Sequence, residues 1–419
     1  MTSEQECYVY IVLPGTVDFV TAGRLVVQEG TAGEYVGRFV YGRNYLANPG
    51  AVAFDPGELP LTDRVFTTVY HNGLFGAIRD ASPDYWGRLI IERHLAKPML
   101  CEVDYLLNSP DDRSGALGFG LGVQPPAPLR AFNRTIDLET LQAAADALVE
   151  DRPLQNASLG QLIRELVMPG TSLGGARPKA AIEHKDELWI AKFNCSTDRW
   201  DNALVEQGLL KLAQSCGIDT PLSEIVKVGE RSVLLVKRFD RERKDQGYRR
   251  HRMLSALTVL KADEEVTGRS RWSYILLAEE LRRLSEQPAK DCEQLFRRMV
   301  FNALVSNTDD HPRNHAIIAS TGWRLSPVYD LSVTPQPGLE HRDLAMSCGD
   351  FGRFANAENL LSQCGRFLLS KEEAGSIINM IVQEVQHGWY KTMRSVGLSE
   401  AGCQIIESSF VNPGFFSCK

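Results

Sequence analysis

The feature that most constrains this chain is a polar segment that directly follows an amphipathic helix. The segment is Asn307-Thr-Asp-Asp-His-Pro-Arg-Asn314, and a second short motif, Pro327-Val-Tyr-Asp-Leu-Ser332, comes soon after it. Apolar residues before the segment recur at helical spacing and predict one buried helix face: Leu295, Phe296, Met299, Val300, Leu304 and Val305. Polar residues placed just past a buried helix are held on a rigid support, so we expect a functional site here.

The spacing of three of these polar residues suits phosphoryl transfer. That reaction needs a carboxylate that positions the acceptor hydroxyl and takes its proton, and an amide oxygen and a second carboxylate that hold Mg²⁺. Asp309 and Asn314 have the spacing of the protein-kinase loop H-R-D-x-x-x-x-N, with Asn307 in the place of the histidine. Asp330 corresponds to the aspartate of D-F-G, although Leu331 follows it. We therefore predict that Asp309 is catalytic and that Asn314 and Asp330 bind Mg²⁺.

The same segment has plainer interpretations. Asn-Thr-Asp-Asp is good turn chemistry, so Asp309 and Asn314 alone are equally well explained as turn and capping residues. His311 and His315 have the spacing of a metal pair, but Pro312 and the absence of a glutamate exclude the H-E-x-x-H zinc motif. His311 has two possible roles: it structures the loop by hydrogen bonds, which is the plainer interpretation, or it contacts a nucleotide.

Segments before the helix supply the other parts of a nucleotide site. Ser172-Leu-Gly-Gly-Ala-Arg-Pro-Lys179 is a glycine-rich loop that lets the backbone approach phosphates, although it is not a Walker A motif. Lys192, on an apolar strand, supplies a cationic group, and Glu206 on the next helix is its expected partner, with an exposed helix pair as the alternative for Glu206. Leu234-Leu-Val-Lys-Arg-Phe-Asp240 indicates a strand that runs into an adenine-contacting hinge. The order of these parts is that of a protein kinase.

In these motifs the chain resembles the HipA-type kinases of bacterial toxin–antitoxin pairs. The resemblance rests on the glycine-rich loop and on Val236-Lys-Arg-Phe-Asp-Arg241, Thr308-Asp-Asp-His-Pro-Arg-Asn314 and Tyr329-Asp-Leu-Ser332. Two N-terminal signatures extend it over nearly the whole chain: Asp84-Tyr-Trp-Gly-Arg88 and Asp112-Arg-Ser-Gly-Ala-Leu117.

The resemblance implies a serine/threonine-protein kinase that uses ATP and Mg²⁺. It implies an α+β, protein-kinase-like fold with a β-rich N-terminal subdomain and an all-α C-terminal lobe. It also implies self-phosphorylation of Ser172, where a phosphate would displace the loop or clash with the nucleotide. The residues expected at the ATP site are Ser172, Gly174, Gly175, Ala176, Lys192, Lys237, Arg238, Phe239, His311 and Arg313.

Partners also follow from the resemblance. A small helix-turn-helix antitoxin similar to HipB would neutralise the kinase, and the pair would repress its own operon, so this chain would meet DNA only through the antitoxin. The acceptor would be a cellular protein, with an aminoacyl-tRNA synthetase as one candidate.

Two other functions stay open at this point. A small-molecule kinase of the aminoglycoside or choline type shares the D-x-x-x-x-N loop, but the first 130 residues are more than such enzymes carry before their phosphate loop. A catalytically dead co-repressor is the second alternative. The retention of all four expected reactive residues argues against it: Lys192, Asp309, Asn314 and Asp330.

The motifs suggest three domains. We expect a HipA-like N-terminal subdomain at 1–130, an N-lobe with phosphate loop, lysine strand and hinge at 131–250, and the C-terminal kinase lobe at 251–419. The first boundary is placed by residues 121–130, because the three prolines there cannot sit inside a helix.

Local patterns predict several elements inside these domains. Residues 7–56 alternate β-branched and aromatic residues with glycine turns and predict strands. Ser82-Pro83-Asp84 predicts a helix start with Pro83 at the first helical position. Ser370-Lys-Glu-Glu373 is a capping box that opens a long C-terminal helix.

Composition narrows the class of protein. Of the 419 residues, 46 are Lys or Arg and 53 are Asp or Glu, so the net charge of −7 argues against a general polyanion binder. Apolar runs are too short for a membrane span, and the acidic N-terminus lacks the basic start of a signal peptide. The nine cysteines are scattered without a C-x-x-C pair, which suits a reducing compartment. We therefore expect a cytoplasmic protein that does not bind membranes.

Overall fold

The computed structural model describes most of the chain. The described residues are 4–30, 33–95, 100–110, 112–128, 132–134, 137–149, 177–244, 247–264, 266–336 and 341–416. They form two compact units. Unit 1 comprises Met1–Cys195, Lys237–Leu254 and Ile318–Thr321, and unit 2 comprises Ser196–Val236, Ser255–Ile317 and Gly322–Lys419. The division into three domains predicted above stays a prediction.

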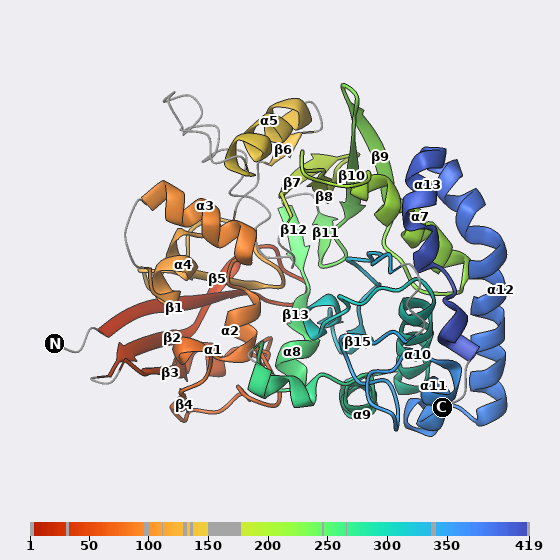
Figure 1. Ribbon diagram of the computed structural model, residues 1–419. Coiled ribbons are helices and arrows are strands. Elements are labelled where there is room, and N and C mark those ends of the chain that lie inside the picture. Colours follow the sequence, from red (N-terminus) through yellow and green to blue (C-terminus); the bar gives the residue numbers. More distant parts are fainter. Residues whose placement is uncertain are drawn as a thin grey trace. The chain divides into compact units, whose positions relative to one another are not determined.

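Unit 1 is rich in β-strands, as the N-terminal sequence predicts (Figure 1). Its strands are β1 (Glu4–Val12), β2 (Phe19–Glu29), β3 (Tyr35–Tyr41), β4 (Phe66–Thr68), β5 (Leu117–Gly120), β6 (Asn133–Arg134), β7 (Lys179–His184), β8 (Glu187–Phe193), β11 (Arg241–Lys244), β12 (Gly247–Arg250) and β13 (Arg252–Ser255, whose last residue belongs to unit 2). Its helices are α1 (Arg43–Leu46), α2 (Gly76–Asp80), α3 (Tyr85–Leu95), α4 (Glu102–Asn108) and α5 (Leu138–Val149), with a 3₁₀ turn η1 (His71–Gly73).

The first sheet of unit 1 is antiparallel and has the strand order β4-β3-β2-β1-β5. The β-branched and aromatic residues of β1 form its core, and Val9, Tyr10, Ile11 and Val12 are all buried. Helix α4 packs on β1 and β5. The prediction of strands is thus confirmed up to Tyr41, whereas Arg43–Leu46 within the predicted range forms helix α1.

Helix α3 begins two residues later than predicted. It starts at Tyr85, so Pro83 lies before the helix and Asp84 occupies the capping position. The Asp84 carboxylate accepts a hydrogen bond from the Gly87 N–H at 2.9 Å, which satisfies one of the free amides at a helix start. A proline followed by an aspartate therefore leaves the capping role to the aspartate.

Unit 2 is mainly helical. Its helices are α7 (Asn202–Ser215), α8 (Ala256–Val259), α9 (Tyr274–Leu284), α10 (Pro288–Leu304), α11 (Ala357–Ser362), α12 (Lys371–Ser395) and α13 (Glu400–Ile406). Short 3₁₀ turns are η3 (Val266–Arg271), η4 (Pro312–Asn314), η5 (Cys364–Phe367), η6 (Glu407–Ser409) and η7 (Pro413–Phe416). Its strands are β9 (Ser223–Val228), β10 (Arg231–Lys237, whose last residue belongs to unit 1), β14 (Ala316–Ala319, which ends in unit 1) and β15 (Trp323–Leu325).

Helix α10 is the centre of unit 2. Helices α9 and α12 pack against it, and α12 also packs along α7 (Figure 1). The predicted capping box opens α12, because the Ser370 hydroxyl accepts from the Glu373 N–H and the Glu373 carboxylate accepts from the Ser370 N–H. Its apolar stripe is buried at Ile377, Ile378, Ile381 and Val385.

The C-terminal lobe differs from the prediction in one respect, because it is not all-α. Strands β14 and β15 are neighbours in a small sheet that follows the polar segment. The β-branched pair Ile317-Ile318 favours a strand, and the short loop between β14 and β15 returns the chain.

Two broader expectations can be compared with the described residues. Within these ranges, no helix combines the length and the apolar character needed to cross a bilayer. The cysteines in the described ranges form no disulfide.

Candidate active site

Helix α10 ends directly before the polar segment and supports it. All six apolar residues of its predicted stripe are buried, which confirms that prediction. The helix closes with a hydrogen bond from the Val305 N–H to the Phe301 carbonyl at 2.9 Å. Ser306 then adopts a φ of 52°, and its hydroxyl donates to the Ser409 carbonyl at 2.7 Å. The chain therefore leaves the helix in a fixed direction.

Asn307 joins the two functional motifs. Its side chain is fully buried, and its amide nitrogen donates to the Asn302 side-chain oxygen on α10 at 3.1 Å. Its own side-chain oxygen accepts from the Ser332 hydroxyl at 2.9 Å. Because Ser332 comes two residues after Asp330 and Asn307 comes two residues before Asp309, this side chain ties the segment of one carboxylate to the segment of the other.

Asp310 is a second buried anchor. Its carboxylate accepts a hydrogen bond from the Tyr274 hydroxyl on α9 and lies 2.6 Å from Nε2 of His315. Burial alone would raise the pKa of Asp310, but His315 and the Tyr274 hydroxyl hold it below its ordinary value. The Asn302 amide nitrogen donates to the same hydroxyl at 3.3 Å, so the two anchors form one connected network. Networks of this kind fix a single loop geometry.

Asp309 projects from this fixed loop and is exposed. Its backbone carbonyl accepts from the His311 N–H at 2.8 Å and from the Asn314 amide nitrogen at 3.2 Å. Partial burial of the carboxyl raises its pKa above the ordinary value, the carboxylates of Asp330 and Asp310 add to the rise, and His311 opposes it. A raised pKa suits a carboxylate that accepts a proton during a reaction.

Asn314 presents an oxygen that suits a metal ion. The residue is 3% exposed, and its amide nitrogen is already used by the Asp309 carbonyl. Its side-chain oxygen is buried and has no hydrogen-bond partner among the described residues. A buried acceptor left in this state carries a desolvation cost, which a bound cation would remove. Mg²⁺ prefers oxygen ligands, so this atom fits the predicted role.

Asp330 is the third residue of the predicted site. Its φ of 62° is uncommon for a residue other than glycine. The chain before it is anchored, because the Tyr329 hydroxyl donates to the Arg313 carbonyl at 2.7 Å and the Val328 N–H donates to the Asp219 carbonyl at 2.9 Å. Its charge acts on the Asp309 carboxyl.

The oxygen donors of Asn314 and Asp330 are of the kind that commonly binds Mg²⁺. Among the described residues there is no group of three or more His, Cys, Asp or Glu side chains that could hold a metal ion. Mg²⁺ is commonly bound through one or two carboxylates, with phosphate oxygens and water completing its shell. The amide of Asn314 with the carboxylate of Asp330 matches that pattern.

His311 and Arg313 lie in the same loop with different partners. The backbone of His311 structures the loop, because its carbonyl also accepts from the Asn314 N–H at 2.8 Å, while its ring packs edge-on against Trp272. The Arg313 guanidinium pairs with Glu264. A contact of either residue with ATP stays a prediction.

Unit 1 contains the described part of the predicted phosphate and adenine segments. Lys192 lies on β8 directly opposite Lys179 on β7. Lys237 forms an ion pair with Glu187 at 3.0 Å, and Phe239 is half-buried. Their contacts with ATP likewise stay predictions.

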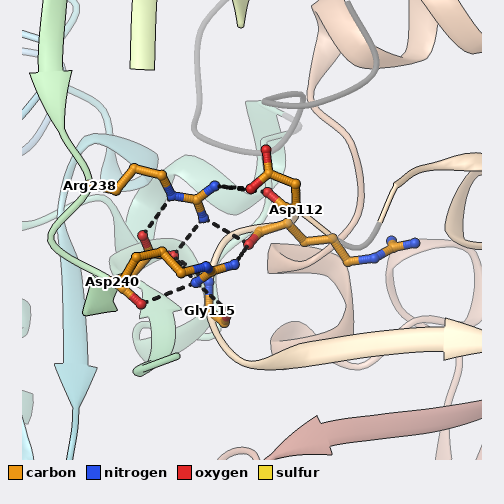
Figure 2. A network of polar contacts seen from close by, with 6 residues as sticks. Asp112, Gly115, Arg238 and Asp240 are labelled. Carbon is orange, nitrogen blue, oxygen red and sulfur yellow. Dashed lines mark hydrogen bonds and ion pairs between the residues drawn. The ribbon is translucent and has the colours of Figure 1, made fainter. Parts of the chain in front are cut away.

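Arg238 does not fit the predicted direct contact with ATP through its side chain. Its guanidinium is completely buried and bonds the carboxylates of Asp112 and Asp240, as Figure 2 shows. Arg241 joins the same cluster through Asp240 at 2.7 Å, and Gly115 donates its N–H to Asp240 at 2.9 Å. These groups hold the pKa of Arg238 above and that of Asp240 below its ordinary value, although burial acts against both charges.

Several predicted residues cannot be placed in this way. Ser172, Gly174, Gly175 and Ala176 lie outside the described residues. Glu206 lies on α7 in unit 2, whereas Lys192 belongs to unit 1, so their pairing stays a prediction.

Sequence reasoning missed the supports of the site. Asp310 was not selected, although two adjacent aspartates were a usable signal, since neighbouring side chains in an irregular segment point in different directions. Tyr274 and Asn302 come from two helices upstream, and only the fold brings them to the loop. The link from Asp112 to Arg238 joins positions 126 apart, so no local pattern could reveal it.

Comparison with known proteins identifies the family of this chain. Residues 171–389 match the family described as the HipA-like C-terminal domain. The chain belongs to this family. The match covers the glycine-rich loop, the hinge segment and both functional motifs, so the HipA-like resemblance predicted from the motifs is confirmed.

Two curated relatives of this HipA-like chain are named as putative kinases. Putative kinase Y4mE of Sinorhizobium fredii is 31% identical over 166 residues, which are 38% of this chain and 38% of that protein. A putative kinase of Haemophilus influenzae is 23% identical over 251 residues, which are 52% of this chain and 71% of that protein. The chain therefore matches well under half the length of the Sinorhizobium protein.

A solved structure shares the fold over nearly the whole HipA-like chain. It is HipA from the Shewanella oneidensis MR-1 complex of HipA, HipB and operator DNA. The TM-score is 0.67 at 17% identity, covering 96% of this chain and 94% of that one. The predicted α+β, kinase-like fold class is thereby confirmed.

Proposed function

We propose that this protein is a serine/threonine-protein kinase that transfers the terminal phosphate of Mg-ATP to a protein hydroxyl and to its own Ser172. Membership of the HipA-like family and the putative kinases among its relatives support a phosphotransferase. The observation that carries the proposal is the Asp309–Asn314–Asp330 arrangement, with an exposed carboxylate and a buried amide oxygen on one rigid loop.

In this proposal each residue of the loop has one task. The Asp309 carboxylate orients the acceptor hydroxyl and accepts its proton, and its raised pKa makes it a better base than an ordinary aspartate. Asn314 and Asp330 hold Mg²⁺, which when bound neutralises charge on the phosphates. Asn307 and Asp310 hold these three groups in register, so that little reorganisation is needed during transfer.

Unit 1 supplies the remaining residues assigned to ATP. In this proposal Lys192 contacts the phosphates and the glycine-rich loop covers them with backbone N–H groups. Lys237, Phe239 and the backbone of Arg238 contact the adenine. Phosphorylation of Ser172 would add negative charge beside the nucleotide phosphates and so switch the kinase off.

The proposed partner is a small helix-turn-helix antitoxin that resembles HipB. The structurally similar HipA is solved in complex with HipB and operator DNA, which supports such a partner for this chain. DNA contact would then be indirect. A cellular protein, with an aminoacyl-tRNA synthetase as one candidate, would be the acceptor.

The test is incubation of the purified full-length protein with labelled ATP, with Mg²⁺ or with EDTA. We expect label on the protein only with Mg²⁺, and mass spectrometry should place it on Ser172. Transfer to aminoglycosides or choline without self-labelling would indicate a small-molecule kinase instead. Absence of Mg²⁺-dependent ATP binding would indicate a catalytically dead co-repressor.

A second experiment tests the partner. The reading frame beside this gene, if it encodes a short helix-turn-helix protein, should be co-expressed with the chain. We expect the chain expressed alone to arrest growth, co-expression to relieve that arrest, and the two proteins to form a stable complex by size-exclusion chromatography. Growth arrest that persists despite co-expression would contradict the proposed neutralisation.

A further inference from the structure

Two lysines face each other where the glycine-rich loop meets the lysine strand. In the antiparallel pair β7–β8, Lys179 is the register partner of Lys192. Directly opposite residues have their side chains on the same face of a sheet, roughly 5 Å apart at Cβ, and like charges in this position repel. Lys179 is also the residue that ends the glycine-rich motif. The position of the Lys179 ammonium group therefore affects both Lys192 and the end of the glycine-rich motif, which are the two parts predicted to contact phosphates.

Asp84 neutralises Lys179. The ammonium group of Lys179 lies 2.5 Å from the Asp84 carboxylate, and the two side chains are 4% and 11% exposed. The other carboxylate oxygen of Asp84 accepts from the Gly87 N–H at 2.9 Å, at the start of α3. Asp84 is therefore fixed by its own helix and holds Lys179 in one place.

A second pair of the same kind holds the predicted hinge segment. Asp112 bonds the Arg238 guanidinium, and both side chains are completely buried. The Asp112 carbonyl also accepts from Arg238 at 3.0 Å, and the Arg113 carbonyl accepts from it at 2.9 Å. Gly115, at a φ of 75° that glycine readily adopts, donates its N–H to Asp240 (Figure 2).

The Asp84–Lys179 and Asp112–Arg238 pairs have the same arrangement. In each, the carboxylate belongs to an N-terminal signature motif, at 84–88 or 112–117, and the cation belongs to a segment assigned to ATP. Buried ion pairs contribute little net stability compared with apolar side chains of similar volume, because both charges lose their hydration. Their best-attested use is to specify one geometry.

We propose that Asp84 and Asp112 are positioning residues for nucleotide binding. They hold Lys179 and Arg238, and through them the end of the phosphate loop and the adenine segment, in the geometry that accepts ATP. The inference rests on the proposed kinase function. It assigns the N-terminal subdomain a direct part in setting ATP affinity, in addition to any contact with a partner.

The experiment measures Mg-ATP binding to the full-length protein by isothermal titration calorimetry. The variants are Asp84→Asn and Asp112→Asn. The matched control is Glu6→Gln, which removes an ion pair with Arg24 at the surface of the same unit. We expect the dissociation constant to rise about tenfold for the two test variants, with kcat at saturating ATP changed less than about twofold. The control should bind as the unaltered protein does.

A second measurement separates positioning from loss of folding. In a Lys179→Met background, Asp84→Asn should leave the ATP dissociation constant unchanged, because Asp84 acts through Lys179. An equal rise in both backgrounds would overturn the inference, as would ATP affinity like that of the unaltered protein in both single variants. If the Asp112→Asn variant fails to fold, the comparison of Asp84→Asn in the unaltered and Lys179→Met backgrounds tests the inference by itself. Absence of Mg-ATP binding by the unaltered protein would instead overturn the proposed function, and the inference with it.

Discussion

At the scale of single residues, the site separates fixed atoms from reactive ones. Asp309 shows this most clearly, since its carbonyl oxygen is held by His311 and Asn314 while its carboxylate stays accessible. Asn314 does the reverse, because its nitrogen is used within the loop and its oxygen is kept for a ligand. In the proposed kinase, this one loop would supply both the base and a metal ligand.

Loss of the Asn314 oxygen should weaken metal use. We expect Asn314→Ala to need more Mg²⁺ for half-maximal transfer and to lose roughly 100-fold in kcat, because one ligand and one loop hydrogen bond disappear. Titration of Mg²⁺ at fixed ATP measures this. An unchanged Mg²⁺ requirement would exclude Asn314 as a ligand.

The pH dependence of transfer should report the raised pKa of Asp309. The base acts only when deprotonated, so activity is lost as pH falls through its pKa, and a raised pKa moves this loss to a pH above the ordinary value of 3.8. A kcat profile, with circular dichroism to exclude acid unfolding, measures the position. A loss at or below the ordinary aspartate value would contradict the assignment.

At the scale of elements, α9 and α10 position the loop through buried polar side chains. Tyr274 and Asn302 emerge from these helices and meet Asp310 and Asn307, so the helices fix both sides of Asp309. Helical periodicity predicted the apolar stripe of α10 but not the buried amide of Asn302. A buried polar residue in an apolar stripe is explained only when its partners are known.

Removal of that amide should affect both stability and turnover. Asn302→Ala leaves the Asn307 donor without its partner, so we expect a loss of about 1–3 kcal/mol in the free energy of unfolding and a fall in kcat larger than any rise in KM. Denaturant unfolding and steady-state kinetics measure these effects. Ser376→Ala, which removes an exposed hydroxyl bond to Glu372 on α12, is the control and should change neither. A kcat equal to that of the unaltered protein would contradict a supporting role for Asn302.

At the scale of the whole molecule, the sequence allowed us to predict the order of the motifs along the chain but not the contacts between residues far apart in it. Loop, lysine, hinge and catalytic segments each carry a local pattern of residue types, so the family and fold class followed from them. One acidic partner of Arg238, Asp112, lies in a loop 126 positions earlier, so the burial of that guanidinium could not be foreseen. The Arg238 side chain was therefore predicted to contact the nucleotide directly.

The buried charge cluster of unit 1 should make its stability depend on pH. The arginines hold the pKa of Asp240 below its unfolded value, so its stabilising contribution is present above that value and is lost as pH falls toward the folded one. Asp240→Asn should cost about 3–5 kcal/mol at neutral pH, because two buried arginines lose their shared partner. Denaturant unfolding measured from neutral pH to below 3.8, the unfolded pKa of Asp240, should show a weaker pH dependence in the variant. An equal pH dependence would contradict this account.

The most direct test of the central claim is Mg²⁺-dependent transfer of labelled phosphate from ATP to protein, compared between the unaltered chain and Asp309→Gln. The account predicts that the variant folds normally, binds Mg-ATP and loses transfer by at least about 100-fold. Asp63→Asn, which alters an exposed carboxylate in unit 1, should transfer at the normal rate. Full transfer by the Asp309→Gln protein would contradict the account.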